Sequence, residues 1–141
     1  MARMPDATDQ PPVRRMSVAR GSLTLKPGTC ASLRGDGAEL LVAARVAGTM
    51  AAKDAARTVP TALPVHLTDA FCDLTVEDGK VVCTVTVQAY ARATLEAFAL
   101  AGAAGALLAL LDAVKAQEQD ASGNFPSARL AGLEVVQNVI A

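Results

Sequence analysis

The sequence predicts an α+β domain in which an antiparallel sheet carries its helices on one face. Two strand-type runs, Val65–Val76 and Lys80–Ala91, flank a turn whose Asp78-Gly79 pair favours the positive φ angles of a type I′ hairpin. A long apolar stretch within Ala93–Asp120 predicts a helix, and Leu130–Ile140 predicts a last strand.

Before the hairpin, a polar N-terminal segment and three shorter elements are expected. Residues 1–12 contain three prolines among polar side chains and are expected to be mobile, whereas residues 13–141 are expected to form one domain. The elements expected there are a short strand at Ser22–Leu25, a short helix at Thr29–Leu33 and an amphipathic helix at Glu39–Arg57, which Pro60 and Pro64 end.

The long helix is apolar on every side. Its segment Ala101–Ala106 contains only Ala and Gly, so it must be covered on more than one face. In so small a chain we expect a second copy of the protein to add to the cover that the sheet provides, which predicts a homo-oligomer. The uncharged run Ala97–Leu111 is shorter than the roughly 18–20 residues that cross a bilayer, so it predicts a buried helix.

The composition excludes several classes of partner. The 141 residues are 52% apolar but only 3% aromatic, and their formal net charge is −1. Because both a basic surface and base-stacking aromatics are lacking, nucleic acid and charged membrane surfaces are not expected partners. The polar, proline-rich N-terminus lacks the apolar stretch of a signal peptide, which predicts a cytoplasmic protein.

The three cysteines are expected to be reduced thiols without a metal. Cys30, Cys72 and Cys83 have neither the C-x-x-C spacing of a zinc site nor an even count. In the register that the Asp-Gly turn implies, Cys72 and Cys83 are diagonal neighbours, which disfavours a disulfide between them.

Self-sufficient catalytic motifs are absent from the sequence, so the candidates are isolated ionisable residues. Lys53 ends a small, apolar helical stretch, and the alternative to a functional role is a cation stabilised at a helix C-terminus. Asp112 and Lys115 are spaced i, i+3, where a surface ion pair is the alternative. Glu96 lies sixteen residues before Asp112, which at about 100° per residue puts the two carboxylates on nearly opposite faces of a helix.

The remaining candidates are the single histidine and a basic cluster. His66 follows Pro64 by two residues, and a structural role is the alternative to a catalytic one. Arg14, Arg15 and Arg20 could form a small anion site, and a solvated basic patch is the alternative.

Three segments together resemble the MoaC family of cyclic pyranopterin monophosphate synthases. Residues 44–53, ARVAGTMAAK, are similar to that family's helix A-R-I-A-G-I-M-A-A-K. Leu95-Glu96 and the later Asp112-Ala113-Val114-Lys115-Ala116 match the spacing from G-V-E-M-E-A to D-M-C-K-A. Met4-Pro5-Asp6 with Val13-Arg14-Arg15 is similar to M-V-D-V-S with a later T-R-R. These matches are collinear over nearly the whole chain.

The resemblance implies a ferredoxin-like fold, assembled as dimers and commonly as a hexamer, with active sites between subunits. It also implies a reaction without metal or organic cofactor, in which a cyclised dihydro-GTP rearranges into cyclic pyranopterin monophosphate with loss of pyrophosphate. Lys53, Asp112 and Lys115 match the family's catalytic lysine, aspartate and second lysine. Asp6 and Glu96 match other acids of the family's pocket.

Three apolar residues stand at matched pocket positions where the family has polar ones. Leu63 takes the place of the histidine in I-P-L-C-H-P-L, Phe98 that of the second Glu of G-V-E-M-E-A, and Leu133 that of a C-terminal lysine. Such a pocket would offer a triphosphate fewer cations and donors. His66, three residues after Leu63, is expected on the opposite face if the segment is an extended strand.

Three hypotheses about function follow. The leading one is a MoaC-like cyclase or lyase that uses Lys53, Asp112 and Lys115 for acid–base steps on a less anionic small molecule in a biosynthetic pathway. The second retains the family reaction, with His66 and an arginine of a partner subunit filling the gaps. The third is a non-catalytic oligomeric scaffold or binding protein, in which the same three residues form an ion-pair cluster at a subunit interface.

Overall fold

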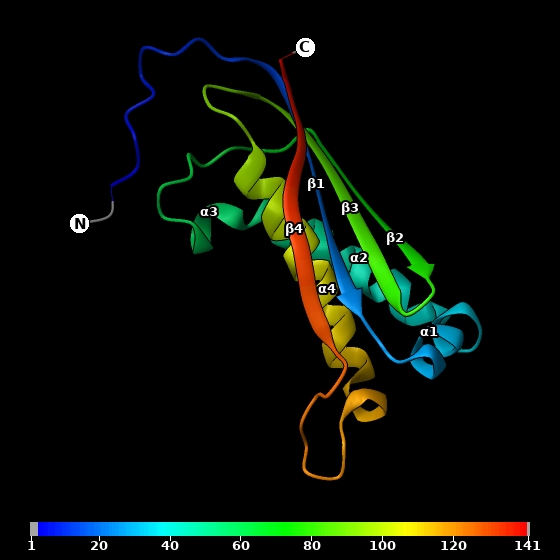
Figure 1. Ribbon diagram of the computed structural model, residues 1–141. Coiled ribbons are helices and arrows are strands. Elements are labelled where there is room, and N and C mark those ends of the chain that lie inside the picture. The colour runs from blue at the N-terminus through cyan, green and yellow to red at the C-terminus, as the bar shows by residue number, and fades with distance from the viewer. Residues whose placement is uncertain (1–2, 141) are drawn as a thin grey trace.

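The computed structural model describes residues 3–140 as a four-stranded antiparallel sheet with helices on one face (Figure 1). Residues 1–2 and 141 lie outside that description, and with them the start of the segment expected to be mobile. In chain order the elements are β1 (Val13–Thr24), α1 (Pro27–Arg34), α2 (Ala38–Lys53), α3 (Ala55–Thr58), β2 (Asp69–Glu77), β3 (Lys80–Ala91), α4 (Glu96–Glu118) and β4 (Arg129–Ile140). With the sheet order β2-β3-β1-β4, this is the ferredoxin-like arrangement, and the predicted α+β class is confirmed.

The β2–β3 hairpin has the predicted register. Glu77 pairs with Lys80 across the turn, and Gly79 there has the positive φ of 75° that such a tight turn requires. Cys72 and Cys83 are therefore diagonal neighbours on the two strands, as expected, and their sulfur atoms lie 3.7 Å apart.

The first strand is longer than predicted. It was expected at Ser22–Leu25 but begins at Val13, because β1 is a central strand that bonds to β3 on one side and to β4 on the other. Before Ser22, the strand contains exposed residues such as Arg14 and Arg20 on one face and buried ones such as Ser17 on the other. The buried face of this part of the strand carries small or polar residues, and the open face carries arginines. The alternation of apolar and polar residues that predicts a strand is therefore not visible in the sequence.

Two predicted boundaries around α3 are also wrong. The helix expected to run to Arg57 is interrupted at Asp54, which separates α2 from the single turn of α3. The strand expected from Val65 begins only at Asp69. Residues 59–68 form an irregular loop instead, and the prolines within it supply no N–H group for a sheet.

Helix α4 lies across the sheet and forms the centre of the core. Phe98, Leu107 and Leu110 on this helix are buried against the sheet and α2. At 23 residues α4 is long and apolar enough to cross a membrane by length and composition alone. Its packing against β1, β3 and α2 is that of the core helix of a soluble protein, which agrees with the predicted buried helix.

Glycines let α2 approach α4 closely. A Cβ atom at Gly48 of α2 would stand 2.8 Å from the Cβ of Ala106 and 3.0 Å from the carbonyl oxygen of Gly102, both on α4. Ala52, one turn along α2, lies beside Gly102. The two helices therefore run antiparallel, and the end of α2 lies beside the first half of α4.

Several apolar side chains remain exposed on the outer surface. Val42, Val46 and Met50 follow each other at four-residue spacing along α2, and each is more than half exposed (57%, 56% and 60%). The edge strand β4 is exposed along almost its whole length.

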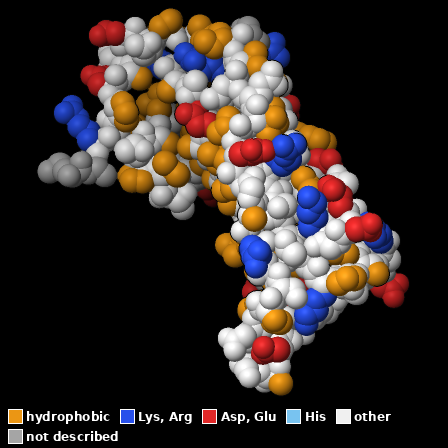
Figure 2. All heavy atoms as spheres, in the orientation of Figure 1, with side chains coloured by type: hydrophobic (Ala, Val, Ile, Leu, Met, Phe, Trp, Pro, Cys, Tyr) orange, Lys and Arg blue, Asp and Glu red, His pale blue; other side chains and the backbone are white. Residues whose placement is uncertain are grey.

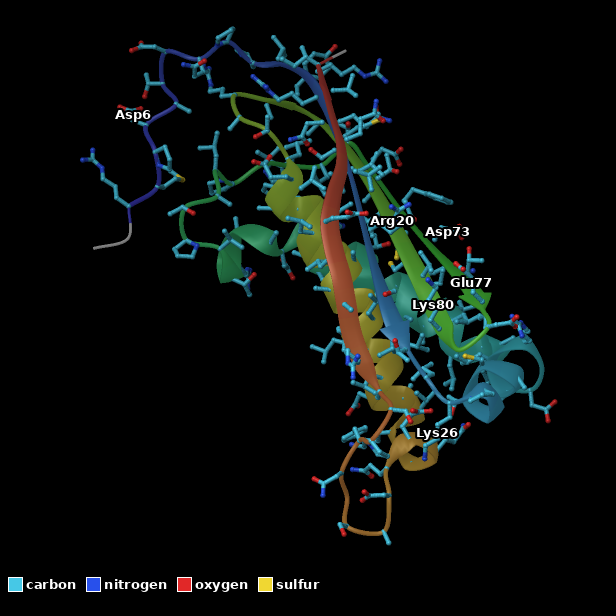
Figure 3. The ribbon with its side chains drawn as sticks, viewed as in Figure 1. Asp6, Arg20, Lys26, Asp73, Glu77 and Lys80 are labelled. Carbon is cyan, nitrogen blue, oxygen red and sulfur yellow. The ribbon has the colours of Figure 1, made fainter. Side chains whose placement is uncertain are left out.

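The open face of the sheet is polar and of mixed charge. Arg20, Asp73, Glu77 and Lys80 lie on this face (Figure 3), and Figure 2 shows Lys and Arg side chains interspersed with Asp and Glu along this side of the molecule. Single-sign charge of the kind that binds nucleic acid is not seen on it.

Candidate active site

A cavity of about 470 Å³ lies between the end of α2 and the loop of residues 59–68. We call it the Lys53 cavity, and its lining residues are Lys53, Asp54, Ala56, Arg57, Pro64, Val65 and His66. Lys53 is the last residue of α2, where a helix dipole favours a cation, and this helix end lies at the cavity. The matched lysine and the single histidine of the chain thus face one space.

His66 also shares a cavity with Leu63. This second cavity has a volume of about 360 Å³ and is lined by Pro12, Leu63, Pro64, Val65, His66, Tyr90, Ala91 and Arg92. The extended strand that would place Leu63 and His66 on opposite faces is not formed, because the segment is a loop, and both residues line this cavity. An imidazole is consequently present beside the position where the family has its histidine.

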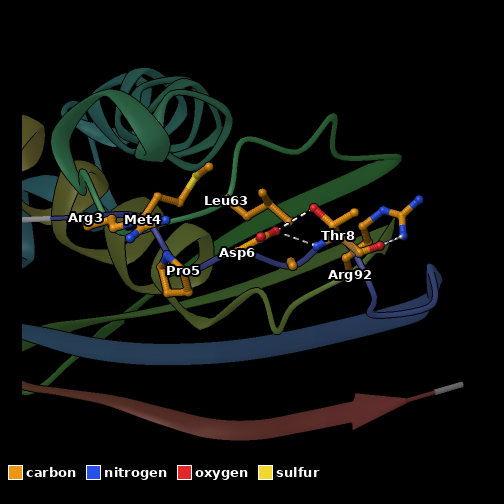
Figure 4. Close-up of a pocket in the computed structure, with 8 residues that line it drawn as sticks. Arg3, Met4, Pro5, Asp6, Thr8, Leu63 and Arg92 are labelled. Atoms are coloured by element: carbon orange, nitrogen blue, oxygen red, sulfur yellow. Dashed lines mark hydrogen bonds between the residues drawn. The ribbon is translucent and has the colours of Figure 1, made fainter.

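Asp6 lies in a third cavity, of about 470 Å³, on the other side of Leu63 (Figure 4). Hydrogen bonds from the hydroxyl and the backbone N–H of Thr8, the latter at 2.9 Å, lower the pKa of Asp6 below its ordinary value. Arg92 Nη1 donates to the carbonyl oxygens of Thr8 at 3.2 Å and Gln10 at 2.6 Å. These bonds hold the N-terminal segment against the end of β3, and Leu63 lines the same cavity.

Asp112 and Lys115 lie towards the opposite end of α4. They form an exposed ion pair, with Nζ of Lys115 3.2 Å from Oδ1 of Asp112. Ala52, next to Lys53, touches Gly102, and Asp112 lies ten residues further along α4, a distance of about 15 Å. One subunit therefore keeps Lys53 apart from Asp112 and Lys115.

Glu96 and Phe98 occupy the first turn of α4. Oε2 of Glu96 is buried and has no hydrogen-bond partner among residues 3–140, which is a costly state for a carboxylate oxygen. Phe98 is only 2% exposed and packs in the core. Its contribution within the subunit is therefore to packing.

The remaining candidates lie on β1 and β4. Arg14 Nη2 donates to Oε1 of Gln88 at 3.1 Å, and Arg15 Nε donates to the carbonyl oxygen of Ala91 at 3.1 Å. Leu133 of β4 is about half exposed, at 49%. None of the three lines the Lys53 cavity.

Two arginines of these cavities escaped the sequence analysis. Arg57 lines the Lys53 cavity, and Arg92 lines the two cavities that Leu63 separates. The available signal for Arg57 was its four-residue spacing from Lys53, but the break in the helix makes that spacing uninformative. Within residues 3–140, no group of three or more His, Cys, Asp or Glu side chains is placed to hold a metal ion.

In this ferredoxin-like domain a lysine at the end of α2 and a loop that contains a histidine line one cavity, and the cavity has the size of small-molecule sites. The sequence matches the model of the MoaC family over residues 4–138, and the chain belongs to that family.

Curated relatives carry the name probable cyclic pyranopterin monophosphate synthase. The chain is 38% identical to the protein of this name from Methanospirillum hungatei, over 98% of this chain and 90% of the relative. It is 35% identical to that of Methanoregula boonei, over 96% and 90% of the two chains, and 35% identical to that of Aeropyrum pernix, over 95% and 94%.

Proposed function

We propose that this protein is a cyclic pyranopterin monophosphate synthase. The observation that carries the proposal is the shared cavity of Lys53 and His66, since it supplies a lysine and an imidazole in a chain that has Leu63 at the family's histidine position. Proton transfers during ring opening and closure require groups that both take up and release protons, and lysine and histidine do so. We prefer this function to a diverged one because the relatives named for the reaction match nearly the whole chain.

The proposed active site lies between two subunits. Lys53 and His66 of one copy would act with Asp112 and Lys115 of another, because one subunit holds these groups at opposite ends of the α2–α4 pair. Exposed Val42, Val46 and Met50 on α2 support an assembly, since soluble monomers seldom expose such a row. A cytoplasmic homo-oligomer, dimeric or hexameric, is part of this proposal.

Partner groups would also resolve the unpaired oxygen of Glu96. A donor from a second subunit or from the substrate would satisfy the buried Oε2 atom, which has no partner within residues 3–140. Asp6, with its lowered pKa, would remain an anion and an acceptor at the neighbouring cavity.

Turnover of the cyclised dihydro-GTP, followed by pyrophosphate release, tests the proposal. The wild-type protein should release pyrophosphate, and Lys53→Ala should lose at least a hundredfold in kcat while keeping its circular dichroism spectrum and its oligomer size. A folded wild-type protein that releases no pyrophosphate would refute the proposed activity.

A pair of variants separates the role of His66 from a structural one. His66→Ala should lower kcat, and adding Leu63→His to that variant should restore part of it, because residue 63 lines the second cavity, which His66 borders together with the Lys53 cavity. The single variant Leu63→His, which keeps His66, is the matched control and should remain active. Full activity of His66→Ala would remove this histidine from the mechanism.

A different substrate is the second candidate, and one observation favours it. Leu63 presents an apolar side chain to the cavities on both of its sides, where the family has a histidine. If pyrophosphate release fails, a less anionic small molecule, rearranged by Lys53, Asp112 and Lys115, becomes the preferred hypothesis. If Lys53→Ala and Asp112→Asn instead dissociate the assembly, these residues hold the subunits together, as the hypothesis of a non-catalytic scaffold requires.

A further inference from the structure

The Lys53 cavity also contains an arginine that the sequence analysis and the family resemblance do not assign. We infer that Arg57 is an anion-binding residue of this cavity, which together with Lys53 and His66 receives a phosphate or pyrophosphate group. The choice of ligand rests on the proposed function, whereas the binding itself can be measured without turnover. Arg57 would thereby supply a cation that the replacement of a C-terminal lysine by Leu133 removes.

The first argument is that the donors of Arg57 are not used for structure. Its Nε atom is 3.9 Å from Oδ1 of Asp54, beyond hydrogen-bond distance, and both side chains are largely exposed. Arg15, Arg45 and Arg92, by contrast, each donate to a backbone carbonyl oxygen. The guanidinium of Arg57 is thus available for a ligand, and its planar set of N–H groups suits phosphate oxygens.

The second argument is the charge around the cavity. Lys53 and Arg57 carry two positive charges against the single negative charge of Asp54, and His66 adds a third when it is protonated. The cavity has a volume of about 470 Å³, within the roughly 300–1,000 Å³ of small-molecule sites. An anion is therefore the class of ligand that this lining favours.

The third argument is that the backbone here offers no help. Lys53 is the last residue of α2 and lines the cavity, so the carbonyl end of this helix, which repels anions, lies beside it. Side chains have to supply the attraction. Removing one of the two permanent cations should therefore have a large effect on binding.

Titration calorimetry with inorganic pyrophosphate tests the inference on the full-length protein. Arg57→Gln should raise the Kd for pyrophosphate about tenfold, as expected for one lost charge-assisted hydrogen bond. Arg57→Lys should keep most of the affinity because it retains the charge. Asp54→Asn should lower the Kd because it removes the competing carboxylate.

Arg34→Gln is the matched control. Arg34 also ends a helix and also lies near a carboxylate, with Nη2 3.6 Å from Oδ1 of Asp78, but it lies outside the cavity. Its variant should bind pyrophosphate like the wild type. Equal Kd values for Arg57→Gln and Arg34→Gln, or no binding by the wild type at millimolar pyrophosphate, would overturn the inference.

The outcomes separate this inference from the proposed function. If pyrophosphate binds with the expected dependence on Arg57 but no turnover occurs, the anion site stands and the reaction is different. If turnover occurs and Arg57→Gln changes neither KM nor pyrophosphate affinity, the reaction stands and the role of Arg57 is refuted. Melting curves of each variant show whether it is folded, and Arg57→Ala, which also removes the charge, serves if Arg57→Gln is not.

Discussion

A methyl group at Gly48 tests the helix packing that positions Lys53. In Gly48→Ala the new Cβ atom would stand 2.8 Å from the Cβ of Ala106, 2.8 Å from Sγ of Cys72 and 3.0 Å from the carbonyl oxygen of Gly102. Favourable carbon contacts lie at about 3.5–4.0 Å. The helices can relieve the overlap only by separating, because Ala106 has no rotamer to change and the carbonyl belongs to the backbone.

The magnitude follows from two opposing effects. Overpacking of a core costs about 1–3 kcal/mol, and the better helix propensity of Ala recovers up to about 1 kcal/mol. We expect Gly48→Ala to lower the free energy of unfolding by about 1–2 kcal/mol, and Tm by about 3–7 °C in a chain of this size. Since Lys53 lies five residues further along α2, kcat should also fall.

Thermal melting and urea unfolding, carried out separately, measure the change in stability. Gly28→Ala is the control. Gly28 lies in α1, and a Cβ atom there would meet nothing within 4 Å, so its substitution should leave stability unchanged or raise it by up to about 1 kcal/mol. If the Gly48→Ala protein is as stable as the Gly28→Ala protein, the close approach of α2 and α4 does not depend on a glycine at position 48.

Three further predictions concern the C-terminal end of α4, the Cys30 thiol and the assembly. Glu118 is fully buried and accepts hydrogen bonds from the hydroxyl of Thr29 and, at 3.1 Å, from the backbone N–H of Lys26. Glu118→Ala should therefore lower the free energy of unfolding by about 2–4 kcal/mol. An unchanged midpoint of urea unfolding would contradict this prediction. Burial raises the pKa of the Cys30 thiol, so the folded state keeps this proton when the unfolded chain begins to lose it. The wild type should therefore lose stability relative to Cys30→Ala above a pH of about 8.5, by up to about 1.4 kcal/mol per pH unit, and no pH-dependent difference between the two would refute this. Inactive Lys53→Ala and Asp112→Asn subunits should regain activity when they are unfolded and refolded together, because a mixed assembly contains some intact sites, and a mixture that stays inactive would contradict a shared site.

The elements predicted correctly are those specified by residues close together in the sequence. The hairpin depends on Asp78-Gly79 and on the alternation of the runs beside it, and its register follows from the backbone geometry of a two-residue turn. The long helix likewise depends on an apolar run within its own segment, and the last strand on the residues of its own segment. The residues of the MoaC resemblance were also visible, because they are side chains at fixed spacings.

The elements predicted wrongly depend on distant partners. The outer half of β1, from Val13, is a strand because β3 and β4 bond to its two edges, although Arg14 and Arg20 mask its alternation. The loop of residues 59–68 was assigned partly to a strand because its apolar residues suit either structure. That error alone placed Leu63 and His66 on opposite faces.

The sequence by itself determined the fold class, the hairpin register and the family, because local backbone geometry and side-chain spacing are sufficient for each. Only the tertiary structure decided that His66 and Arg57 share a cavity with Lys53, and that Asp112 and Lys115 lie far along α4 from it. The path of an irregular loop, and which residues of one helix contact which residues of another, are fixed by packing between distant segments of the chain. At Gly48 that packing depends on the absence of a single methyl group.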